Sequence, residues 1–164
     1  MAIKESSKII ILMRHATRAF DGDHLSMVGR NQAIDLPKIL AELGVPMPTR
    51  LHSSPKTRTL ETLRFLAGQL NRKIEINPHL DERGGSETLP DFERRVLAFI
   101  HGLETSETES AIVCSHLDWL ETAALLLTSN ESDLDRAEPW SPMAIRAYIF
   151  DEAIWKRLQE RSKA

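Results

Sequence analysis

The sequence predicts a three-layer α/β/α sandwich with a mostly parallel central sheet, and three features indicate this fold class. Apolar runs of strand length alternate along the chain with longer segments of helical periodicity, which is the order of βαβ units. The first run, residues 8–13, is almost continuously apolar, as in a strand that is buried on both faces. The chain has 164 residues and shows neither an internal repeat nor a linker, so we expect a single domain over residues 1–164.

The first strand is followed by a region of helical periodicity. Ser26 can cap its start, and Gly44, with a proline two residues later, ends it. Pro37 lies inside the pattern, and we therefore expect a kink or a break near Asp35. The apolar positions of this region are Val28, Ala33, Leu36, Ile39, Leu40 and Leu43.

A second βα unit and a third strand come next. Residues 50–53 form a short strand, and Pro55 suits the first turn of a helix over residues 56–70. Residues 73–76 are the third predicted strand. The apolar side of the helix carries Leu60, Leu63, Leu66, Ala67 and Leu70.

The next segments continue the alternation. Thr88 is the expected cap of a helix that runs to about Leu103. Residues 111–115 then form the fourth strand, and residues 117–127 form the helix behind it. The inward positions of the first of these helices are Phe92, Val96, Phe99 and Ile100.

The C-terminal part is less regular. Residues 129–142 read as a polar loop, and residues 144–150 read as a late strand. The tail, residues 154–159, fits two structures. Its composition suits a helix, whereas a tight turn at Asp151-Glu152 would make it the second strand of a hairpin.

Composition and charge exclude several function classes. The formal net charge is −3, with 21 basic and 24 acidic residues and no basic stripe, so nucleic acid is not an expected partner. No apolar segment reaches the length of a signal peptide or a membrane span, and we expect a soluble, cytoplasmic protein without a membrane partner. The single cysteine, Cys114, lies inside an apolar run and is expected to be a small buried residue rather than a catalytic thiol.

Polar residues follow the predicted strands at the points where they end. Arg14 and His15 follow the first strand, Arg58 the second, Glu82 the third and His116 the fourth. In a parallel sheet these positions lie on one edge, where open α/β sheets bind their ligands. Two arginines and two histidines there would form a strongly cationic pocket, and a phosphoryl group is the ligand whose oxygens suit arginine forks.

Five short motifs follow one another along most of the chain. They are Leu12-Met13-Arg14-His15-Ala16, the segment from Leu25-Ser26 through Gly29 to Gln32-Ala33, Ser54-Pro55 with Arg58 and Thr62, Leu80-Asp81-Glu82, and Ser115-His116. Together and in this order they resemble the histidine phosphatase superfamily, the fold of cofactor-dependent phosphoglycerate mutases and many phosphatases. A motif of this kind would be weak alone, but five in family order are specific.

The resemblance implies a covalent mechanism without a metal or another cofactor. His15 would attack phosphorus and form a phosphohistidine that water later hydrolyses, with its other ring nitrogen bonded to a backbone carbonyl. Arg14, Arg58 and His116 would hold the non-bridging oxygens. Glu82 would protonate the leaving group, which requires a raised carboxyl pKa.

Some roles stay open at this level. The carboxyl acid could be Asp81 or Glu87 in place of Glu82, or no residue at all, because only residues 83–87 separate Glu82 from the next helix. Arg18 could reach the rim of the phosphate site or lie in solvent. The other histidines are expected outside the site, and no pair has metal-ligand spacing. They are His24, His52, His79 and His101.

The short segment after Glu82 and the Ser115-His116-Leu117 sequence resemble the short bacterial phosphohistidine phosphatases, which act on phosphorylated signalling proteins. A pocket without a lid favours hydrolysis over a mutase reaction and could admit a phosphorylated side chain of a partner protein. The alternative partner is a small phosphate ester, which a phosphomonoesterase with the same residues would hydrolyse. A mutase-type phosphotransferase and a non-catalytic phosphate-binding module are further alternatives.

Overall fold

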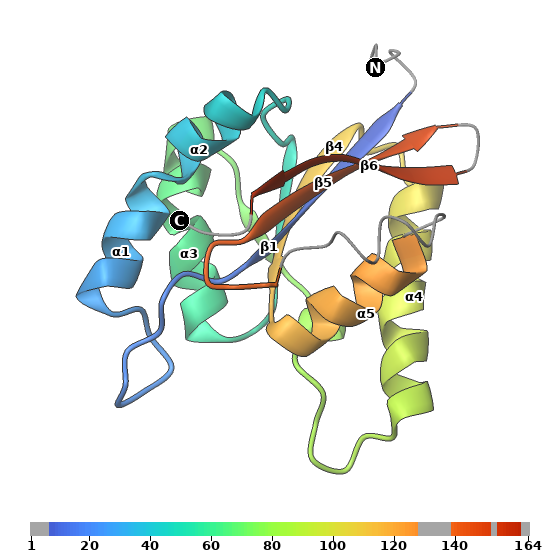
Figure 1. Cartoon of the computed structure of the whole chain (residues 1–164), viewed down its shortest axis with the longest axis horizontal. Helices are drawn as coiled ribbons and strands as arrows, with labels where there is room; N and C mark the ends of the chain where they lie inside the picture. Colours follow the sequence, from blue (N-terminus) through green and yellow to red (C-terminus); the bar gives the residue numbers. More distant parts are fainter. Residues whose placement is uncertain (1–6, 128–138, 152–153, 162–164) are drawn as a thin grey trace.

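The computed structural model describes residues 7–127, 139–151 and 154–161, and within these ranges the chain forms a six-stranded sheet between two layers of helices (Figure 1). The strands are β1 (Lys8–Arg14), β2 (Arg50–Ser53), β3 (Ile74–Ile76), β4 (Ser110–Ser115), β5 (Ile145–Asp151) and β6 (Ile154–Arg161). The helices are α1 (Met27–Ile34), α2 (Leu36–Leu43), α3 (Thr57–Leu70), α4 (Leu89–Thr105) and α5 (Leu117–Leu127), with a 3₁₀ turn η1 (Pro78–Leu80).

The strand order is β3-β2-β4-β1-β5-β6, and the first four of these strands run parallel to one another. Strand β5 is antiparallel to β1, and β6 is antiparallel to β5. The predicted fold class, an α/β/α sandwich with a mostly parallel sheet, is therefore confirmed. Of the two structures that the sequence allowed for the tail, the hairpin is the one that forms.

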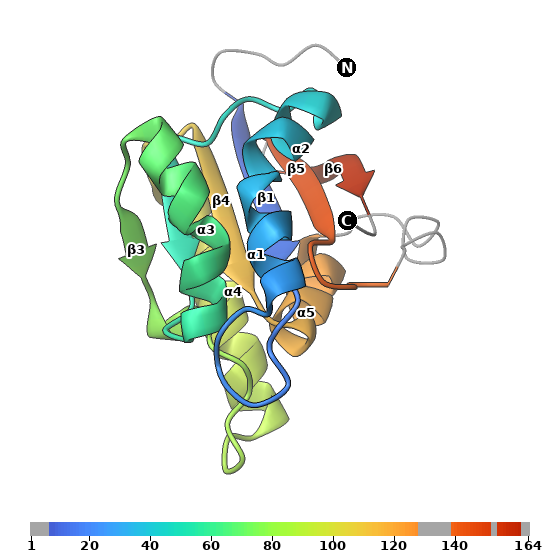
Figure 2. The same ribbon diagram turned by 90° about the vertical axis from the view of Figure 1, so that its left-hand side faces the viewer.

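The two faces of the sheet bury separate cores. Ile9, Ile11 and Met13 of β1 pack with residues of α1, α2 and α3. Ile10 and Leu12, which point to the opposite face, pack with residues of α4 and α5. Figure 2 shows α1 and α3 side by side on the first face. Because β1 is covered on both faces, its continuous apolar sequence is explained.

The helix break that the sequence predicts near Asp35, from the presence of Pro37, is confirmed. Helix α1 ends at Ile34 and α2 begins at Leu36, with Asp35 between them. Gly44 ends α2 with a φ of 69°, a left-handed conformation that glycine adopts without steric cost.

Two details of the sequence prediction are wrong. Val28, assigned to an apolar face, is 60% exposed, because the short helix α1 buries Gly29 and Ala33 instead. Pro55 does not lie in the first turn of α3, which begins at Thr57 after Lys56 as N-cap.

The remaining elements agree closely with the sequence prediction. Thr88 caps α4 by accepting the Asp91 N–H, and the helix extends to Thr105. Cys114 is fully buried, and burial raises the pKa of its thiol. Of the predicted polar loop, residues 129–138 lie outside the described residues, and residues 139–142 contain no helix or strand. None of the helices in the described ranges is long and apolar enough to cross a membrane.

Candidate active site

A pocket of about 300 Å³ lies at the carboxyl ends of β1 and β4 and at the start of α3. Its lining residues are Arg14, His15, Arg18, Arg58, Glu82, His116, Leu117, Asp118 and Pro142. The structure thus brings together the five residues that the sequence placed at one edge of the sheet, from segments far apart in the chain. Arg18, which the sequence left between the rim and the solvent, is exposed at this pocket.

His15 is held in one orientation by its own backbone. Its Nδ1 lies 2.7 Å from the carbonyl oxygen of Ala16, and since a carbonyl can only accept, Nδ1 carries the proton. Burial lowers the pKa of His15 to about 4, and the charges of Arg58, Arg14 and Arg18 act in the same direction, against the hydrogen bond to Ala16. The imidazole is therefore neutral at pH 7, and Nε2 is the ring nitrogen with a free lone pair.

The residues that follow His15 are tied to two helices. The Ala16 N–H donates to Thr62 Oγ1 in α3 at 2.9 Å, and the Thr17 N–H donates to Gln32 Oε1 in α1 at 3.0 Å. Ser26 Oγ donates to the Thr17 carbonyl at 3.1 Å. The second motif and Thr62 of the third motif therefore position the backbone beside His15. Arg58, which also belongs to the third motif, lies in the pocket itself.

Gly29 in the second motif is required by close packing. A Cβ at this position would lie 2.1 Å from the carbonyl oxygen of Thr17, a distance that no side chain can adopt. Helix α1 can approach the loop after β1 because it has no side chain at this point.

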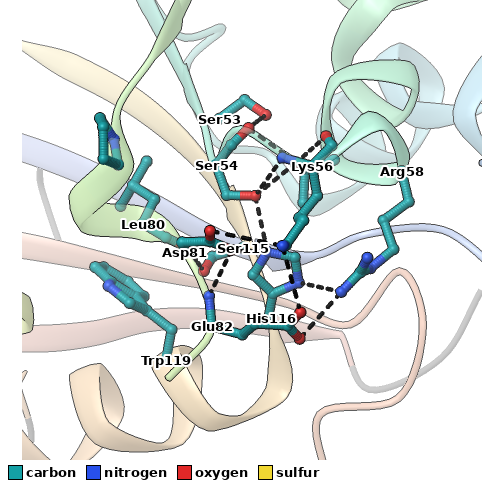
Figure 3. A network of polar contacts seen from close by, with 12 residues as sticks. Ser53, Ser54, Lys56, Arg58, Leu80, Asp81, Glu82, Ser115, His116 and Trp119 are labelled. Carbon is teal, nitrogen blue, oxygen red and sulfur yellow. Dashed lines mark hydrogen bonds and ion pairs between the residues drawn. The ribbon is translucent and has the colours of Figure 1, made fainter. Parts of the chain in front are cut away.

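Arg58 is buried, and its guanidinium points toward His116 and Glu82 (Figure 3). Its Nη1 donates to Asp23 Oδ1 at 2.9 Å, and its Nη2 donates to Glu82 Oε2 at 3.1 Å. The same Nη2 lies 3.3 Å from His116 Nδ1. Because a guanidinium can only donate, Nδ1 of His116 is an acceptor here.

His116 consequently has the opposite tautomer from His15. Its Nε2 lies 2.7 Å from Ser54 Oγ and donates to it, since Nδ1 carries no proton. Burial lowers the pKa of His116 to about 3, helped by the positive charges of Arg58 and Lys56. The two imidazole rings lie 5.6 Å apart between centroids.

Asp23 is a functional residue that the sequence analysis missed. Besides its contact with the Arg58 side chain, its carboxylate accepts the N–H groups of Thr57 at 2.9 Å and Arg58 at 3.3 Å at the start of α3. Burial alone would raise the pKa of Asp23, but the hydrogen bonds from Thr57 and Arg58 lower it below its usual value. No sequence signal pointed to this contact, because only the structure shows that the N-cap of α3 is Lys56, whose side chain cannot accept these N–H groups.

Arg14, at the end of β1, is fixed by the loop before β5. Its Nη1 donates to the carbonyl oxygen of Trp140 at 2.7 Å. Within the described part of the chain, its Nε is buried without a hydrogen-bond partner. Burial lowers the pKa of Arg14, and the charge of Arg58 contributes to the shift.

The structure distinguishes the three carboxylates that the sequence left open as acids. Glu82 lines the pocket, and its side chain is 44% exposed. Asp81 lies behind it, with Oδ1 3.7 Å from His116 Nε2. Glu87 points away and forms an ion pair with Arg95 at 2.8 Å.

Lys56 is a further residue beside the site that the sequence analysis did not place there. Its Nζ lies 3.7 Å from a carboxylate oxygen of Asp81 and 3.8 Å from one of Glu82.

The other histidines lie elsewhere. His52 is buried against Phe99, while His24, His79 and His101 do not line the pocket. In residues 7–127, 139–151 and 154–161, no three His, Cys, Asp or Glu side chains gather closely enough to hold a metal ion.

Comparison with known proteins gives one family match and several similar folds. A sequence model of the histidine phosphatase superfamily (branch 1) matches residues 10–87. An uncharacterized chloroplastic protein of Arabidopsis thaliana is 38% identical over 80 residues, which is 44% of this chain and 36% of that protein. This chain therefore matches only about a third of the relative's length.

Two solved structures share the fold over nearly the whole chain. The protein histidine phosphatase SixA, complexed with tungstate, has a TM-score of 0.74 at 22% identity, covering 94% of this chain and 96% of that one. The mycobacterial glucosyl-3-phosphoglycerate phosphatase has a TM-score of 0.75 at 15% identity, covering 96% of this chain and 100% of that one.

Proposed function

We propose that this chain is a phosphatase of the histidine phosphatase superfamily, whose sequence model matches residues 10–87, and that its nucleophile is His15. The observation that carries the proposal is the 2.7 Å contact of His15 Nδ1 with the Ala16 carbonyl, which leaves Nε2 unprotonated in a cationic pocket. A neutral imidazole with a fixed tautomer is what an in-line attack on phosphorus requires.

The reaction has two steps in this proposal. In the first, Nε2 of His15 forms a bond to phosphorus, while the bond from phosphorus to the leaving group breaks and the leaving group keeps the electron pair. In the second, water attacks the phosphohistidine, orthophosphate leaves, and His15 becomes neutral again. Glu82 is the carboxyl group best placed to give the leaving group a proton in the first step, because it lines the pocket.

The arginines supply the charge stabilisation. Arg14 and Arg58 lie in the pocket wall and Arg18 at its exposed side, so three guanidinium groups can neutralise the transferring phosphoryl group. His116 joins them only after a change, because its Nδ1 accepts from Arg58 in the structure. To donate to a phosphoryl oxygen, Nδ1 must first take up a proton.

A phosphohistidine on a partner protein is the substrate that we propose. Only residues 83–88 connect Glu82 to α4, and this loop extends beyond the carboxyl edge of the sheet (Figure 1). A phosphorylated side chain could therefore enter the pocket. The similar fold of SixA, a protein histidine phosphatase, supports the same substrate class. A cytoplasmic location remains an expectation from the sequence.

A small phosphate ester is the alternative substrate. The mycobacterial structure with a similar fold is a glucosyl-3-phosphoglycerate phosphatase, so this fold also serves small molecules. A panel at matched concentration separates the two classes: a phosphohistidine protein, sugar phosphates, nucleotides and phosphoglycerates. The proposed substrate requires the phosphohistidine protein to have the highest kcat/KM.

Trapping the intermediate tests the mechanism. After brief reaction with ³²P-labelled substrate and an acid-free quench, the protein should carry an acid-labile, base-stable label that His15→Ala does not acquire. Activity should survive exhaustive chelation, since arginines neutralise the phosphoryl charge here. Full turnover by His15→Ala would overturn the mechanism, and loss of activity on chelation with recovery on adding Mg²⁺ or Zn²⁺ would overturn its independence of metal.

A further inference from the structure

The pocket carries charges of opposite sign on its walls. Arg14, Arg18 and Arg58 make one part of the lining cationic. Glu82 and Asp118 contribute carboxylates to the same lining. The arginines match the phosphoryl group and Glu82 is the proposed proton donor, but the mechanism does not use the carboxylate of Asp118.

Asp118 is held in place by backbone donors. In the first turn of α5, its Oδ2 accepts the Arg83 N–H at 2.9 Å, and its Oδ1 accepts the Trp119 N–H at 2.7 Å. Because Arg83 directly follows Glu82, the first of these bonds joins the loop that carries Glu82 to the start of α5. The two acidic residues therefore lie on the same side of the pocket.

The charge of Asp118 is not neutralised by a neighbouring cation. Arg83 turns its guanidinium to the carbonyl oxygen of Glu87 at 2.9 Å. Among the residues that the structure describes, no Lys, Arg or His side chain forms an ion pair with Asp118 within 4.0 Å. Glu82 differs in this respect, since Arg58 and Lys56 both lie beside it.

Binding of a phosphoryl group would increase the difference in charge between the arginine side of the pocket and the side with Glu82 and Asp118. The phosphoryl oxygens compete with Glu82 for Nη2 of Arg58, so the ion pair of Glu82 with Arg58 is weakened. Within the described ranges, Asp118 is held by backbone N–H groups alone and keeps its full negative charge. With the three arginines engaged by the phosphoryl oxygens, the part of the substrate beyond them meets the carboxylates of Glu82 and Asp118. A positive charge there is attracted, and a negative charge is repelled.

We propose that Asp118 makes this pocket selective for phosphorylated groups that carry a positive charge close to phosphorus, and selective against those that carry a carboxylate there. The inference rests on the proposed function and narrows its substrate class. A protonated phosphoimidazole, as in phosphohistidine, satisfies the selection, and so does an aminoalkyl phosphate. A phosphoglycerate does not.

Two small probes isolate this selectivity. Phosphoethanolamine and phosphoglycolate both carry a phosphate on a two-carbon group, which ends in an ammonium in the first and in a carboxylate in the second. Titration calorimetry at pH 7.5 should show that the wild-type protein binds phosphoethanolamine about tenfold more tightly. Single ion pairs at partly exposed sites change affinity by about two- to fivefold, and in this comparison attraction and repulsion add.

Asp118→Asn removes the charge but keeps an oxygen that can accept the Arg83 N–H. We expect the preference to fall to about threefold or less in this variant. Glu93→Gln is the matched control, because it removes one carboxylate from the exposed side of α4 and should leave the preference unchanged. If Asp118→Asn does not fold, the wild-type preference should still decrease between about 0.05 M and about 0.5 M salt, as screening requires.

An equal affinity for the two probes, a preference for phosphoglycolate, or an unchanged preference in folded Asp118→Asn would overturn the proposal. These measurements need no turnover. If the selectivity is found but neither a phosphohistidine protein nor an aryl phosphate is hydrolysed, the proposed function fails while the charge selectivity stands. The reverse result would leave the phosphatase intact and remove the role of Asp118.

Discussion

Arg58 is the residue at which the loops of the site meet. One nitrogen of its guanidinium is bound by Asp23 and the other by Glu82, and both carboxylates come from loops that follow different strands. Asp23 also accepts the N–H groups at the start of α3, so a single carboxylate sets the position of both the helix and the side chain. Arg58 is thus aligned by Asp23, while its contact with Glu82 can be exchanged for a phosphoryl oxygen.

Asp23→Asn should therefore damage catalysis more than folding. The amide keeps one acceptor for the helix N–H groups but loses the ion pair, so we expect kcat/KM to fall by about 10- to 100-fold and stability by about 1 kcal/mol. Steady-state kinetics and urea unfolding measure the two effects. Asp21→Asn in the same exposed loop is the control and should change neither. An equal loss of kcat/KM in both variants would contradict the role of Asp23.

His116 is predicted to gain a proton when phosphate binds. Its Nδ1 accepts from Arg58, and the low pKa of about 3 keeps this nitrogen unprotonated in the free site. A phosphoryl oxygen next to Nδ1 raises that pKa, because the anion favours the imidazolium, or else the oxygen itself carries the proton. Calorimetry of orthophosphate binding at pH 7.5, in buffers of different ionisation enthalpy, should show net uptake of up to one proton. His116→Gln should abolish the uptake, and a wild-type value of zero would contradict the assigned tautomer.

The effect of replacing Glu82 on the hydrolysis rate is predicted to depend on the leaving group of the substrate. If it is the general acid, Glu82→Gln should slow hydrolysis of an alkyl phosphate by roughly 10²–10⁴-fold. An aryl phosphate and a phosphohistidine should be slowed much less, since an acidic phenol leaves without help and a phosphoimidazole can leave already protonated. Glu87→Gln is the control, because Glu87 is bound to Arg95 outside the pocket. Equal losses on all three substrates would show a positioning role for Glu82 instead.

At the scale of the elements, helix α1 supports the position of His15, because it packs closely against the loop after β1. Gly29→Ala would place a Cβ 2.1 Å from the Thr17 carbonyl, so α1 or the loop must shift. We expect a loss of more than about 2 kcal/mol in stability, together with a lower kcat/KM as the backbone beside His15 moves. Chemical unfolding and kinetics test both.

Gly68→Ala in the middle of α3 is the matched control for this change. A Cβ at Gly68 meets no atom within 4 Å, so the same substitution should stabilise the helix by about 0.5–1 kcal/mol and leave activity unchanged. If Gly29→Ala were as harmless as Gly68→Ala, the close packing of α1 on the loop would not hold.

The elements also show how far the sequence could predict this structure. Strands β1 and β4 were recognisable because a strand buried on both faces needs an unbroken apolar run. The break between α1 and α2 was recognisable because proline is excluded from a helix interior but tolerated in a first turn, which is where Pro37 lies in α2. The tail was ambiguous, since its strand β6 forms by pairing with the open edge of β5, which local sequence does not encode. The site residues at the strand ends were predictable because the apolar runs show where these strands end.

Asp23, Lys56 and Asp118 were not predictable in this way. Each comes from a loop or a helix start, and its place in the site depends on contacts with residues far away in sequence, such as Asp23 with Arg58 and Asp118 with Arg83.

At the scale of the whole molecule, the site is made from one edge of the sheet between two cores. Strand β1 contacts the core under α1 to α3 with alternate residues and the core under α4 and α5 with the others. His15 follows the end of this strand and is 7% exposed, and His116 follows β4 and is 3% exposed. Burial of these two imidazoles links the chemistry of the site to the stability of the fold.

This linkage predicts how stability depends on pH. Burial lowers the pKa of His15 to about 4 and that of His116 to about 3, and it also lowers the pKa of His52. In the unfolded chain each of these histidines titrates near about 6.5. Below that pH the unfolded state binds protons that the folded state does not, so stability is complete above about pH 6.5 and is lost as the pH falls toward 4.

Urea unfolding at intervals between pH 7 and pH 4.5 measures the effect. While a histidine is protonated only in the unfolded chain, it contributes a slope of about 1.4 kcal/mol per pH unit. Asp23, whose pKa is lowered below that of an ordinary carboxyl, loses its stabilising contribution only at lower pH, so the window above pH 4.5 reports mainly on the histidines.

Variants of the histidines test which of them cause the slope. The double variant His15→Gln with His116→Gln should reduce the slope and leave the part due to His52. His101→Gln, on the exposed surface of α4, is the control and should leave the slope unchanged. A wild-type stability that stays constant from pH 6.5 to pH 4.5 would show that these imidazoles are not held neutral by the fold, and the neutral nucleophile would lose its structural basis.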